Sequence, residues 1–409
     1  MRLGRLRTLV LLPWLLTMTV TVLAQCPVAD FTLPANACQS EDVRPLFTPT
    51  AEIGSYYWDA CDGALSGTPA LSHARTMAAA VDALDIKSVD EGSRHFAFIV
   101  SRGGSNSSNL LRVELTADLS DTLSVSDIGS LNPFVKPTGI ALHEEGSQKY
   151  ALIAYNDQRF MLASFGNSWS NTPSGSAVPG LTALSGQAFL TNVAISKIKG
   201  RIVAFCGNAG YNELLMIDFG SSIANTPTLR KITGLGTSGD FKGVDVIRSC
   251  NSTFVVLADN GKGVFVVNFG TDIDAVPSPT MVSNQKLYGI AIAMESDHFI
   301  VMGTSNAGLV RIDLGTDIEN TSPTETVLGT FGIMTSPYGF ALHRSGSKFT
   351  GLVINNSDGN LGIIDFPKPC NLTGDYANTA SPAFTYTAAG TFPVTLYAQD
   401  MKTELDLQS

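Results

Sequence analysis

Short apolar runs recur along this chain at regular intervals, separated by turns rich in glycine and asparagine. Each recurrence contains two apolar strands, an Asn- or Gly-bearing turn and a third strand, and none shows a helical period. A loop with Gly and Pro follows the third strand; its copies are FGNSWSNTP at Phe165–Pro173, FGSSIANTP at Phe219–Pro227, FGTDIDAVP at Phe269–Pro277 and LGTDIENTSP at Leu314–Pro323. The pattern predicts repeated antiparallel β-structure between residues 83 and 366.

The spacing of the repeat indicates an all-β ring. Equivalent positions lie about 45 to 54 residues apart, so six units fit within the repeat. A unit of this length with three or four strands is typical of a β-propeller blade. The first strands carry a small central residue, such as Ala141, Ala291 and Ala341, which suits the crowded axis of a ring. We therefore predict a six-bladed β-propeller, with a solenoid of stacked hairpins as the alternative.

The last unit lacks a fourth strand of its own, because the repeat ends at Ile364-Asp365-Phe366. The segment from Trp58 to Pro69, which precedes the first unit, looks like a loose copy of the repeated loop. We predict that a strand within Ala70–Val81 forms the outer strand of the sixth unit, because an open sheet edge would otherwise remain.

Two segments outside the repeat resemble parts of one known domain. Tyr57–Gly63 reads YWDACDG, similar to the W-D-F-G-D-G motif of the polycystic kidney disease-type (PKD) domain, from which it departs at Ala60 and Cys61. Phe384–Leu396 reads FTYTAAGTFPVTL, similar to the family's Y-x-x-x-G-x-Y-x-V-x-L. The chain as a whole resembles exported Bacteroidetes-type proteins that combine PKD-like domains with a β-propeller.

This resemblance implies a division of the chain. A propeller of residues 67–367, with its closing strand taken from 70–81, is expected to be inserted in or flanked by an immunoglobulin-like PKD-type β-sandwich whose halves are 25–66 and 368–409. Two separate partial domains are the competing arrangement. The resemblance also implies a secreted or cell-surface module without catalytic activity.

The N-terminal residues 1–24 have the pattern of a secretory signal peptide. Three arginines precede the apolar run Leu9–Leu16, and Val22-Leu23-Ala24 supplies small residues for cleavage before Gln25. A membrane anchor and a lipoprotein signal that ends at Cys26 are the alternatives. We predict an exported protein, secreted or at the cell surface, with no integral membrane segment after cleavage.

Six cysteines follow the predicted signal peptide, and an even number in an oxidising compartment favours disulfides. In the inserted arrangement, Cys61 and Cys370 lie at the entry and exit of the propeller and are expected to pair. A further candidate pair is Cys26 with Cys38, whereas Cys206 and Cys250 could either pair or stay free. Because no CxxC occurs and histidines do not alternate with cysteines at zinc spacing, we predict no metal site.

Composition excludes two classes of protein. The chain is 44% hydrophobic and 15% charged, which argues against a largely disordered protein. Its formal net charge is −10 and its pI is about 5, so no overall basic surface for nucleic acid is present.

Few residues suggest chemistry. Asp85 and Asp245 are expected at the small central position of opposite first strands, where two carboxylates could bind a cation or act as an acid/base pair. Trp169 could stack on a sugar ring or serve as a packing residue. His143 and His343 occupy the same place in two units, and this duplication favours a turn-flanking role over catalysis. We predict no catalytic residue and no cofactor.

The function predicted from these observations is a non-enzymatic interaction module that binds an unknown protein or glycan through propeller loops. One alternative is a propeller enzyme of the glycoside hydrolase or lactonase type. Another is a passive spacer in a surface assembly. Because propellers serve many functions, the predicted fold cannot choose among these alternatives.

Overall fold

A computed structural model describes most of the chain. The described residues are 31–32, 42–48, 53–103, 109–129, 131, 136–157, 159–181, 189–249, 251–345, 348–370, 372, 376–386 and 394–400. The predicted signal peptide of residues 1–24 and the cysteines Cys26, Cys38 and Cys250 lie outside these residues.

Six four-stranded antiparallel sheets follow one another along the described chain. The first contains β6 (Ala83–Glu91), β7 (Arg94–Ser101), β8 (Asn109–Leu115) and β9 (Thr122–Asp127). The second contains β10 (Pro137–Glu145), β11 (Gln148–Tyr155), β12 (Phe160–Gly166) and β13 (Ser174–Ala177). The third contains β14 (Leu190–Ile198), β15 (Arg201–Asn208), β16 (Glu213–Gly220) and β17 (Thr228–Ile232).

The remaining three sheets follow the same order. The fourth contains β18 (Phe241–Ser249), β19 (Ser252–Asp259), β20 (Gly263–Gly270) and β21 (Ser278–Ser283). The fifth contains β22 (Ile290–Glu295), β23 (His298–Ser305), β24 (Gly308–Asp313) and β25 (Thr324–Gly329). The sixth contains β26 (Pro337–Ser345), β27 (Lys348–Asn355), β28 (Asn360–Phe366) and, from before the repeat, β5 (Ala70–Thr76).

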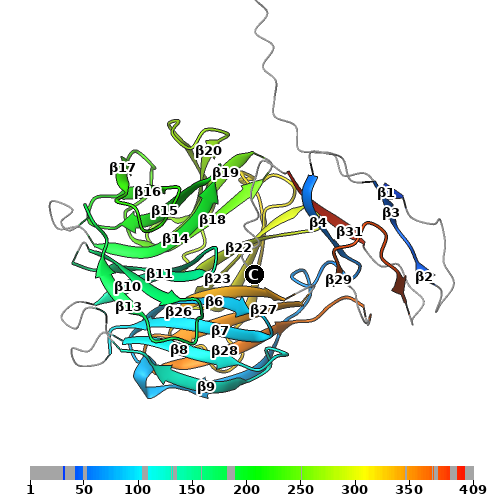
Figure 1. Cartoon of the computed structure of the whole chain (residues 1–409), viewed down its shortest axis with the longest axis horizontal. Coiled ribbons are helices and arrows are strands. Elements are labelled where there is room, and N and C mark those ends of the chain that lie inside the picture. The colour runs from blue at the N-terminus through cyan, green and yellow to red at the C-terminus, as the bar shows by residue number, and fades with distance from the viewer. Residues whose placement is uncertain are drawn as a thin grey trace, which may run out of the picture.

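The six sheets form a closed ring (Figure 1). The first strand of each sheet packs against the first strand of the next, and β26 of the last sheet packs against β6 of the first. One cluster of buried apolar side chains fills the seam between each pair of neighbouring sheets, the seam between the sixth and first sheets included. The hydrophobic core is therefore divided into six similar parts around the ring.

The repeated loop keeps its shape because particular residues fix it. Gly166 adopts a φ of 68°, which other residue types disfavour. The side-chain amide of Asn171 donates a hydrogen bond to the backbone carbonyl of Phe165 at 2.8 Å. The residue between them is buried under the loop; it is Trp169 in this copy and Ile223, Ile273 or Ile318 in the others.

Charged side chains tie each loop to the preceding sheet. Glu91 of β6 accepts a hydrogen bond from the amide of Trp169 at 3.2 Å, and Arg112 of β8 donates to the Trp169 carbonyl at 2.9 Å. Arg230 of β17 donates in the same way to the carbonyl of Ile273 at 3.2 Å. The repeated loops thus hold neighbouring sheets together.

The segment before β5 behaves as another copy of this loop. Leu65 is buried, its amide donates to Glu295 of β22 at 2.8 Å, and its carbonyl accepts from Arg311 of β24 at 2.6 Å. β5 then pairs with β28 as the outermost strand of the sixth sheet. A strand from before the repeat therefore completes the ring.

A smaller group of strands lies beside the ring, and we call it the flanking unit (Figure 1). Its strands are β1 (Phe31–Thr32), β2 (Asp42–Val43), β3 (Leu46–Phe47), β4 (Ile53–Asp59), β29 (Tyr376–Ala377), β30 (Phe384–Thr385) and β31 (Thr395–Asp400). β4 pairs with both β29 and β31, and β2 pairs with β30. Segments that precede and follow the ring therefore share sheets.

The flanking unit has a core of its own around Trp58. Trp58 is fully buried, meets the rings of Phe31 and Phe47 edge-on, and donates from its indole nitrogen to the carbonyl of Thr379 at 2.9 Å. A disulfide between Cys61 and Cys370 joins the two segments of the unit, with 5.7 Å between the Cα atoms. This disulfide confirms one of the predicted pairs.

For Cys206, the alternative of a free thiol is the one observed. Cys206 is a free cysteine, buried on β15 among apolar side chains between two sheets, so it is not bonded to Cys250. Burial raises the pKa of its thiol to about 12, which leaves it inert at neutral pH. Within the residues described, no helix has the length and apolar character needed to cross a membrane.

Candidate functional site

A cavity of about 540 Å³ opens at one end of the ring, beneath the flanking unit. Five of the six first strands contribute to its wall, and Tyr57, Tyr376 and Tyr397 of the flanking unit contribute aromatic rings. Its charged lining residues are Lys87, Asp90, Asp245, Arg248 and Arg344. The cavity therefore combines aromatic surface with an excess of basic side chains, a combination that suits a small anionic ligand.

Arg344 joins the ring to the flanking unit at this cavity. Its guanidinium donates to the hydroxyl of Tyr57 and, at 3.1 Å, to a carboxylate oxygen of Asp59. The same group lies 4.7 Å from the ring centre of Tyr57 and 5.0 Å from that of Tyr397. Burial opposes its charge, but the neighbouring tyrosines and aspartates hold the pKa of Arg344 above its ordinary value. A fixed cation thus lies in the cavity wall.

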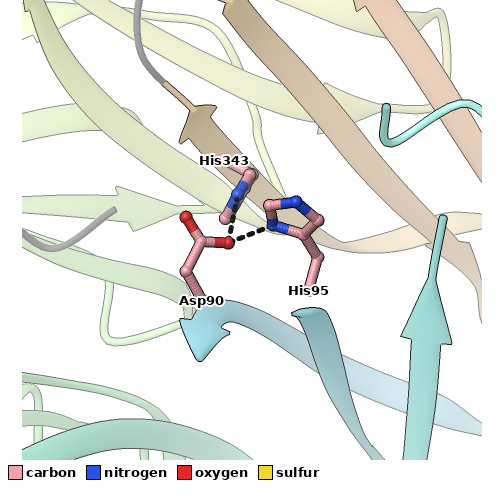
Figure 2. A group of neighbouring side chains, drawn as sticks. All are labelled: Asp90, His95 and His343. Atoms are coloured by element: carbon pink, nitrogen blue, oxygen red, sulfur yellow. Dashed lines mark hydrogen bonds and ion pairs between the residues drawn. The ribbon is translucent and has the colours of Figure 1, made fainter. Parts of the chain in front are cut away.

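Three titratable side chains meet at the edge of the same cavity (Figure 2). Asp90 is partly exposed and lines the cavity, whereas His95 and His343 are buried. One Asp90 oxygen, Oδ1, contacts His95 Nδ1 and lies 3.0 Å from His343 Nε2. The other nitrogen of His343, Nδ1, is hydrogen-bonded to the hydroxyl of Ser88 at 3.2 Å. Both imidazoles are therefore directed at a single carboxylate oxygen.

The fold explains why these residues meet. Asp90 on β6 and His95 on β7 are directly opposite each other in the antiparallel ladder. His343 lies on β26, the strand that packs against β6 where the ring closes. The cluster therefore spans the seam between the last and first sheets.

The two imidazoles set the charge of the carboxylate. Burial disfavours ionisation of Asp90, but hydrogen bonds and charges from His343 and His95 outweigh burial and hold the pKa of Asp90 below its ordinary value. Asp90 is therefore a carboxylate at neutral pH. An ionised carboxylate beside two imidazoles at a cavity wall can take up and return protons.

Asp85 and Asp245, the predicted carboxylate pair, have structural roles. Asp85 is buried and accepts from the amide of Ile140 in the next sheet at 2.9 Å. Asp245 accepts in the same manner from the amide of Ile292 at 2.8 Å. Each aspartate also accepts from the amide of the residue that follows it. Burial raises the pKa of both carboxyl groups.

Contrary to the prediction, the two aspartates also do not occupy equivalent positions in their sheets. Asp85 pairs across its sheet with Val100, just as Gly243 pairs with Ala258. Asp85 therefore aligns with Gly243, two residues before Asp245. Their carboxylates bind backbone amides of neighbouring strands, so they do not form the predicted acid/base pair across a channel.

Trp169, predicted as a ligand-binding candidate, is fully buried. Its ring packs against Phe98 and Phe165, and its indole nitrogen donates to Glu144 at 2.8 Å. The ligand-binding interpretation is wrong, because this position anchors the repeated loop between two sheets.

The repeat pattern does not reveal the cluster, because in the sequence His343 is recognisable only as a duplicate of His143. The duplication is real, but the neighbours differ. The sheet that follows His143 has Lys197 opposite Ile202 where the sheet beside His343 has Asp90 opposite His95. The signal that could have found the cluster lies in the repeat that follows each histidine. Lys197 and Ile202 follow His143 there, whereas Asp90 and His95 occupy the same positions beside His343.

Comparisons with known proteins identify similar folds but no family. No protein-family model and no curated protein matches the chain. Trypanosoma rangeli sialidase is 11% identical with a TM-score of 0.46, and the match covers 70% of this chain and 55% of the sialidase. The allergen Mala s 1 of Malassezia sympodialis is 10% identical with a TM-score of 0.47, covering 76% of this chain and 96% of the allergen.

An α-L-arabinofuranosidase from Clostridium thermocellum is also similar, at 10% identity and a TM-score of 0.43, covering 60% of this chain and 94% of the enzyme. The match with the sialidase spans only about half of that enzyme's length. Four-stranded antiparallel sheets arranged in a closed ring define one known architecture. The fold is a β-propeller.

These comparisons correct the predicted function. The sequence pattern predicts a non-enzymatic module that binds a protein or glycan. The sialidase and the arabinofuranosidase are enzymes by name, so the non-enzymatic prediction is withdrawn. At identities of 10% and 11% the likeness concerns the fold alone, so the reaction must be argued from the residues of this chain.

Proposed function

We propose that this chain is a β-propeller hydrolase of the lactonase type, which opens a small cyclic ester in the cavity beneath the flanking unit. One observation carries the proposal: the Asp90 carboxylate, in contact with two imidazoles, lines a cavity that also holds Lys87, Arg248 and Arg344. A proton-transferring group and fixed positive charge are the two requirements of ester hydrolysis.

The reaction follows from this arrangement. Water attacks the ester carbonyl carbon while the Asp90–histidine cluster takes one of its protons. Positive charge from Lys87 and Arg344 stabilises the negative charge that forms on the carbonyl oxygen. The bond between the carbonyl carbon and the ring oxygen then breaks, and the cluster returns the proton to the leaving alkoxide. The product is a hydroxy acid, which releases its carboxyl proton to solvent, and the same cations hold the resulting carboxylate.

Ester opening fits these residues better than glycoside cleavage. Most glycosidases use two carboxyl groups on opposite sides of the scissile bond. The described lining of the cavity contains two acidic residues, Asp90 and Asp245. Both oxygens of Asp245 already accept backbone amide hydrogens, at 2.9 and 2.8 Å. One carboxylate is therefore left for chemistry, which is sufficient for general-base hydrolysis of an ester.

We further propose the domain organisation in which this site lies. The ring is a six-bladed propeller of residues 67–367, inserted between the halves of a PKD-like sandwich at 25–66 and 368–409. The pairing of β4 with β29 and β31, together with the Cys61–Cys370 disulfide, supports this division. The disulfide also supports export through a signal peptide at residues 1–24, to the cell surface or the medium.

The test is hydrolysis by the purified full chain with its disulfide intact. Release of acid from a panel of γ- and δ-lactones and aryl esters would be followed with a pH indicator, beside a panel of aryl glycosides. We expect lactone opening, and a loss of about 100-fold or more in kcat/KM in Asp90→Asn. Asp313→Asn is the matched control, because Asp313 also contacts a histidine, His298, but does not line the cavity.

Two results would overturn the proposal. Absence of lactone and ester hydrolysis by the folded chain would exclude this reaction class. Cleavage of aryl glycosides alone would replace it with a glycoside hydrolase, and Asp90→Asn would then show whether the same cavity is used.

A further inference from the structure

We propose that Asp90, His95 and His343 form a binding site for a first-row divalent transition-metal ion of the Zn²⁺ type. The evidence for this site is the geometry of the three side chains, and it does not depend on the proposed hydrolase activity. A role for the ion in activating water, by contrast, rests on the proposed function.

The donor atoms are of the right kind and lie close enough together. His95 Nδ1, His343 Nε2 and a carboxylate oxygen of Asp90 all lie within 4.8 Å of one another (Figure 2). Two imidazole nitrogens and one carboxylate oxygen are a common set of protein ligands for zinc and for other first-row ions. A small shift of these side chains is enough to place one ion at bonding distance from all three.

His343 supplies the second, independent observation. Its Nε2 is buried, and among the described residues its polar neighbour is the single Asp90 oxygen Oδ1, at 3.0 Å. A buried ring nitrogen and a carboxylate oxygen at this distance are costly unless a proton or a metal cation lies between them. An ion bound to both atoms removes this cost.

The hydroxyl of Ser88 orients that histidine. When His343 Nδ1 donates its proton to Ser88 Oγ, at 3.2 Å, Nε2 carries the lone pair that a metal requires. Metal-binding histidines commonly donate their second ring nitrogen in this way, which fixes the ring and raises its basicity. Ser88 is therefore a positioning residue for the site.

The backbone prearranges the ligands. Asp90 and His95 are opposite one another on β6 and β7, and His343 is held by β26 across the seam where the ring closes. A bound ion would therefore link the first and last sheets and stabilise closure of the ring. Because Asp90 and Ser88 also line the cavity, the ion has a path of entry and the three ligands leave a coordination position for water.

The chain contains two natural comparisons. His143 occupies the repeat position of His343, but the adjacent sheet presents Lys197 and Ile202 in place of Asp90 and His95. His298 contacts Asp313 at 2.9 Å on an exposed surface, without a second histidine among the described residues nearby. Neither place assembles three donors.

The experiment is a metal titration of the full chain, purified without an affinity tag, freed of metal with a chelator and then dialysed. Isothermal titration calorimetry with ZnCl₂ is expected to show one site per chain, and saturation is expected to raise Tm. Co²⁺ loading is expected to give a visible d–d spectrum. His95→Gln and Asp90→Asn should each weaken Zn²⁺ binding by at least about 100-fold, and His143→Gln should leave it unchanged. Ser88→Ala should weaken it by about 10-fold.

The outcomes separate this inference from the proposed hydrolysis. No saturable binding of Zn²⁺ or Co²⁺ by the folded wild-type chain would overturn the metal site, as would binding that survives in His95→Gln and Asp90→Asn. Full lactone hydrolysis by the metal-free protein would leave the hydrolase standing and exclude the water-activating role. Tight one-site binding without any hydrolysis would establish the metal site and reject the hydrolase.

Discussion

The two ends of the ring are built from the same repeated strands, yet they differ in chemistry. The cavity beneath the flanking unit measures about 540 Å³, and a second cavity of about 690 Å³ lies among residues at the opposite ends of the first strands, such as Leu84, Thr138, Asn192 and Tyr338. At the second cavity two of the three charged lining side chains pair with each other: Asp240 lies 2.9 Å from Lys242, and it also accepts from Asn260 at 3.0 Å. Cavity size therefore does not distinguish the two ends.

The first cavity is distinguished by residues that break the repeat. Tyr57 and Tyr397 come from outside the ring, and Arg344 is fixed by contact with them. Asp90 and His95 meet His343 only at the seam where the last sheet joins the first. We infer that the repeat supplies a rigid scaffold, and that the chemistry arises where the repeat ends and the flanking unit is attached.

The largest expected effect comes from releasing the flanking unit. The double substitution Cys61→Ser with Cys370→Ser removes a disulfide that joins residues 309 positions apart. For a loop of this length, loop-closure entropy gives a loss of about 6 kcal/mol as an upper limit. Guanidinium unfolding followed by Trp fluorescence measures the loss, with Trp58 in the flanking unit and Trp169 in the ring as separate reporters. Cys206→Ala, which removes a free cysteine, should cost much less; equal losses would contradict this assignment.

The next prediction compares the two ends of the ring directly. Arg344→Ala removes a cation from the first cavity and should lower kcat/KM for lactone opening by about 100-fold, or about 2.7 kcal/mol. Arg344→Lys keeps the charge but loses the planar contacts with Tyr57, so we expect an intermediate loss. Lys242→Ala removes a cation from the opposite cavity and should change kcat/KM by less than about twofold. Equal losses in Arg344→Ala and Lys242→Ala would remove the distinction between the ends.

Whether a feature of this structure could be predicted from the sequence depends on how far apart in the chain its interacting residues lie. The ring and its repeated loop follow local patterns, because Gly166, Asn171 and the buried residue at Trp169 act within a few residues of one another. The closing strand β5 could be predicted because the last repeat lacks a fourth strand of its own. The Asp90 cluster could not be predicted in this way. Asp90 and His343 are far apart in the chain and meet only through ring closure, and the neighbours that distinguish His343 from His143 lie in the next sheet.

The same limit explains the errors on Asp85 and Trp169. Both are conspicuous in the sequence because their chemistry differs from that of the equivalent residues in other repeats. In the structure, Asp85 satisfies the amide of Ile140, and Trp169 fills the space that isoleucine fills elsewhere. An unusual residue in a repeat can thus serve packing as well as function, and the distinction requires knowledge of what the side chain contacts.

A pH dependence is expected where the flanking unit meets the ring. Burial, chiefly, raises the pKa of Glu295 to about 7; Asp62 and Asp59 raise it further, and backbone hydrogen bonds from Leu65 and Ser66 oppose the shift. Because the folded pKa lies above the ordinary 4.5, this contribution to stability is present below pH 4.5 and is lost as pH rises through about 7. We expect a decrease of about 2 to 3 kcal/mol in the free energy of unfolding.

Glu295→Gln is neutral at every pH and should abolish this part of the decrease. Denaturant unfolding of both proteins between pH 5 and pH 8 measures the effect. His298 also senses Glu295, so His298→Gln controls for its titration. The opposite end of the ring supplies the comparison, since Asp240→Asn should leave the decrease in place. An identical pH dependence in wild type and Glu295→Gln would contradict the assignment.

The smallest expected effect tests whether Asp85 is structural. Asp85→Asn retains one side-chain oxygen to accept from the backbone amides of Ile86 and Ile140, and it loses the second. We expect a loss of about 1 kcal/mol in the free energy of unfolding, because one buried amide loses its partner. Lactone hydrolysis should be unchanged, since Asp85 binds the backbone of the neighbouring strand and does not line the first cavity. Asp90→Asn should differ by losing lactone hydrolysis, and it should also lose stability because the Asp90 carboxylate contacts two buried imidazoles. If Asp85→Asn were inactive but fully stable, carboxylate chemistry would lie deeper in the ring than the cavity beneath the flanking unit.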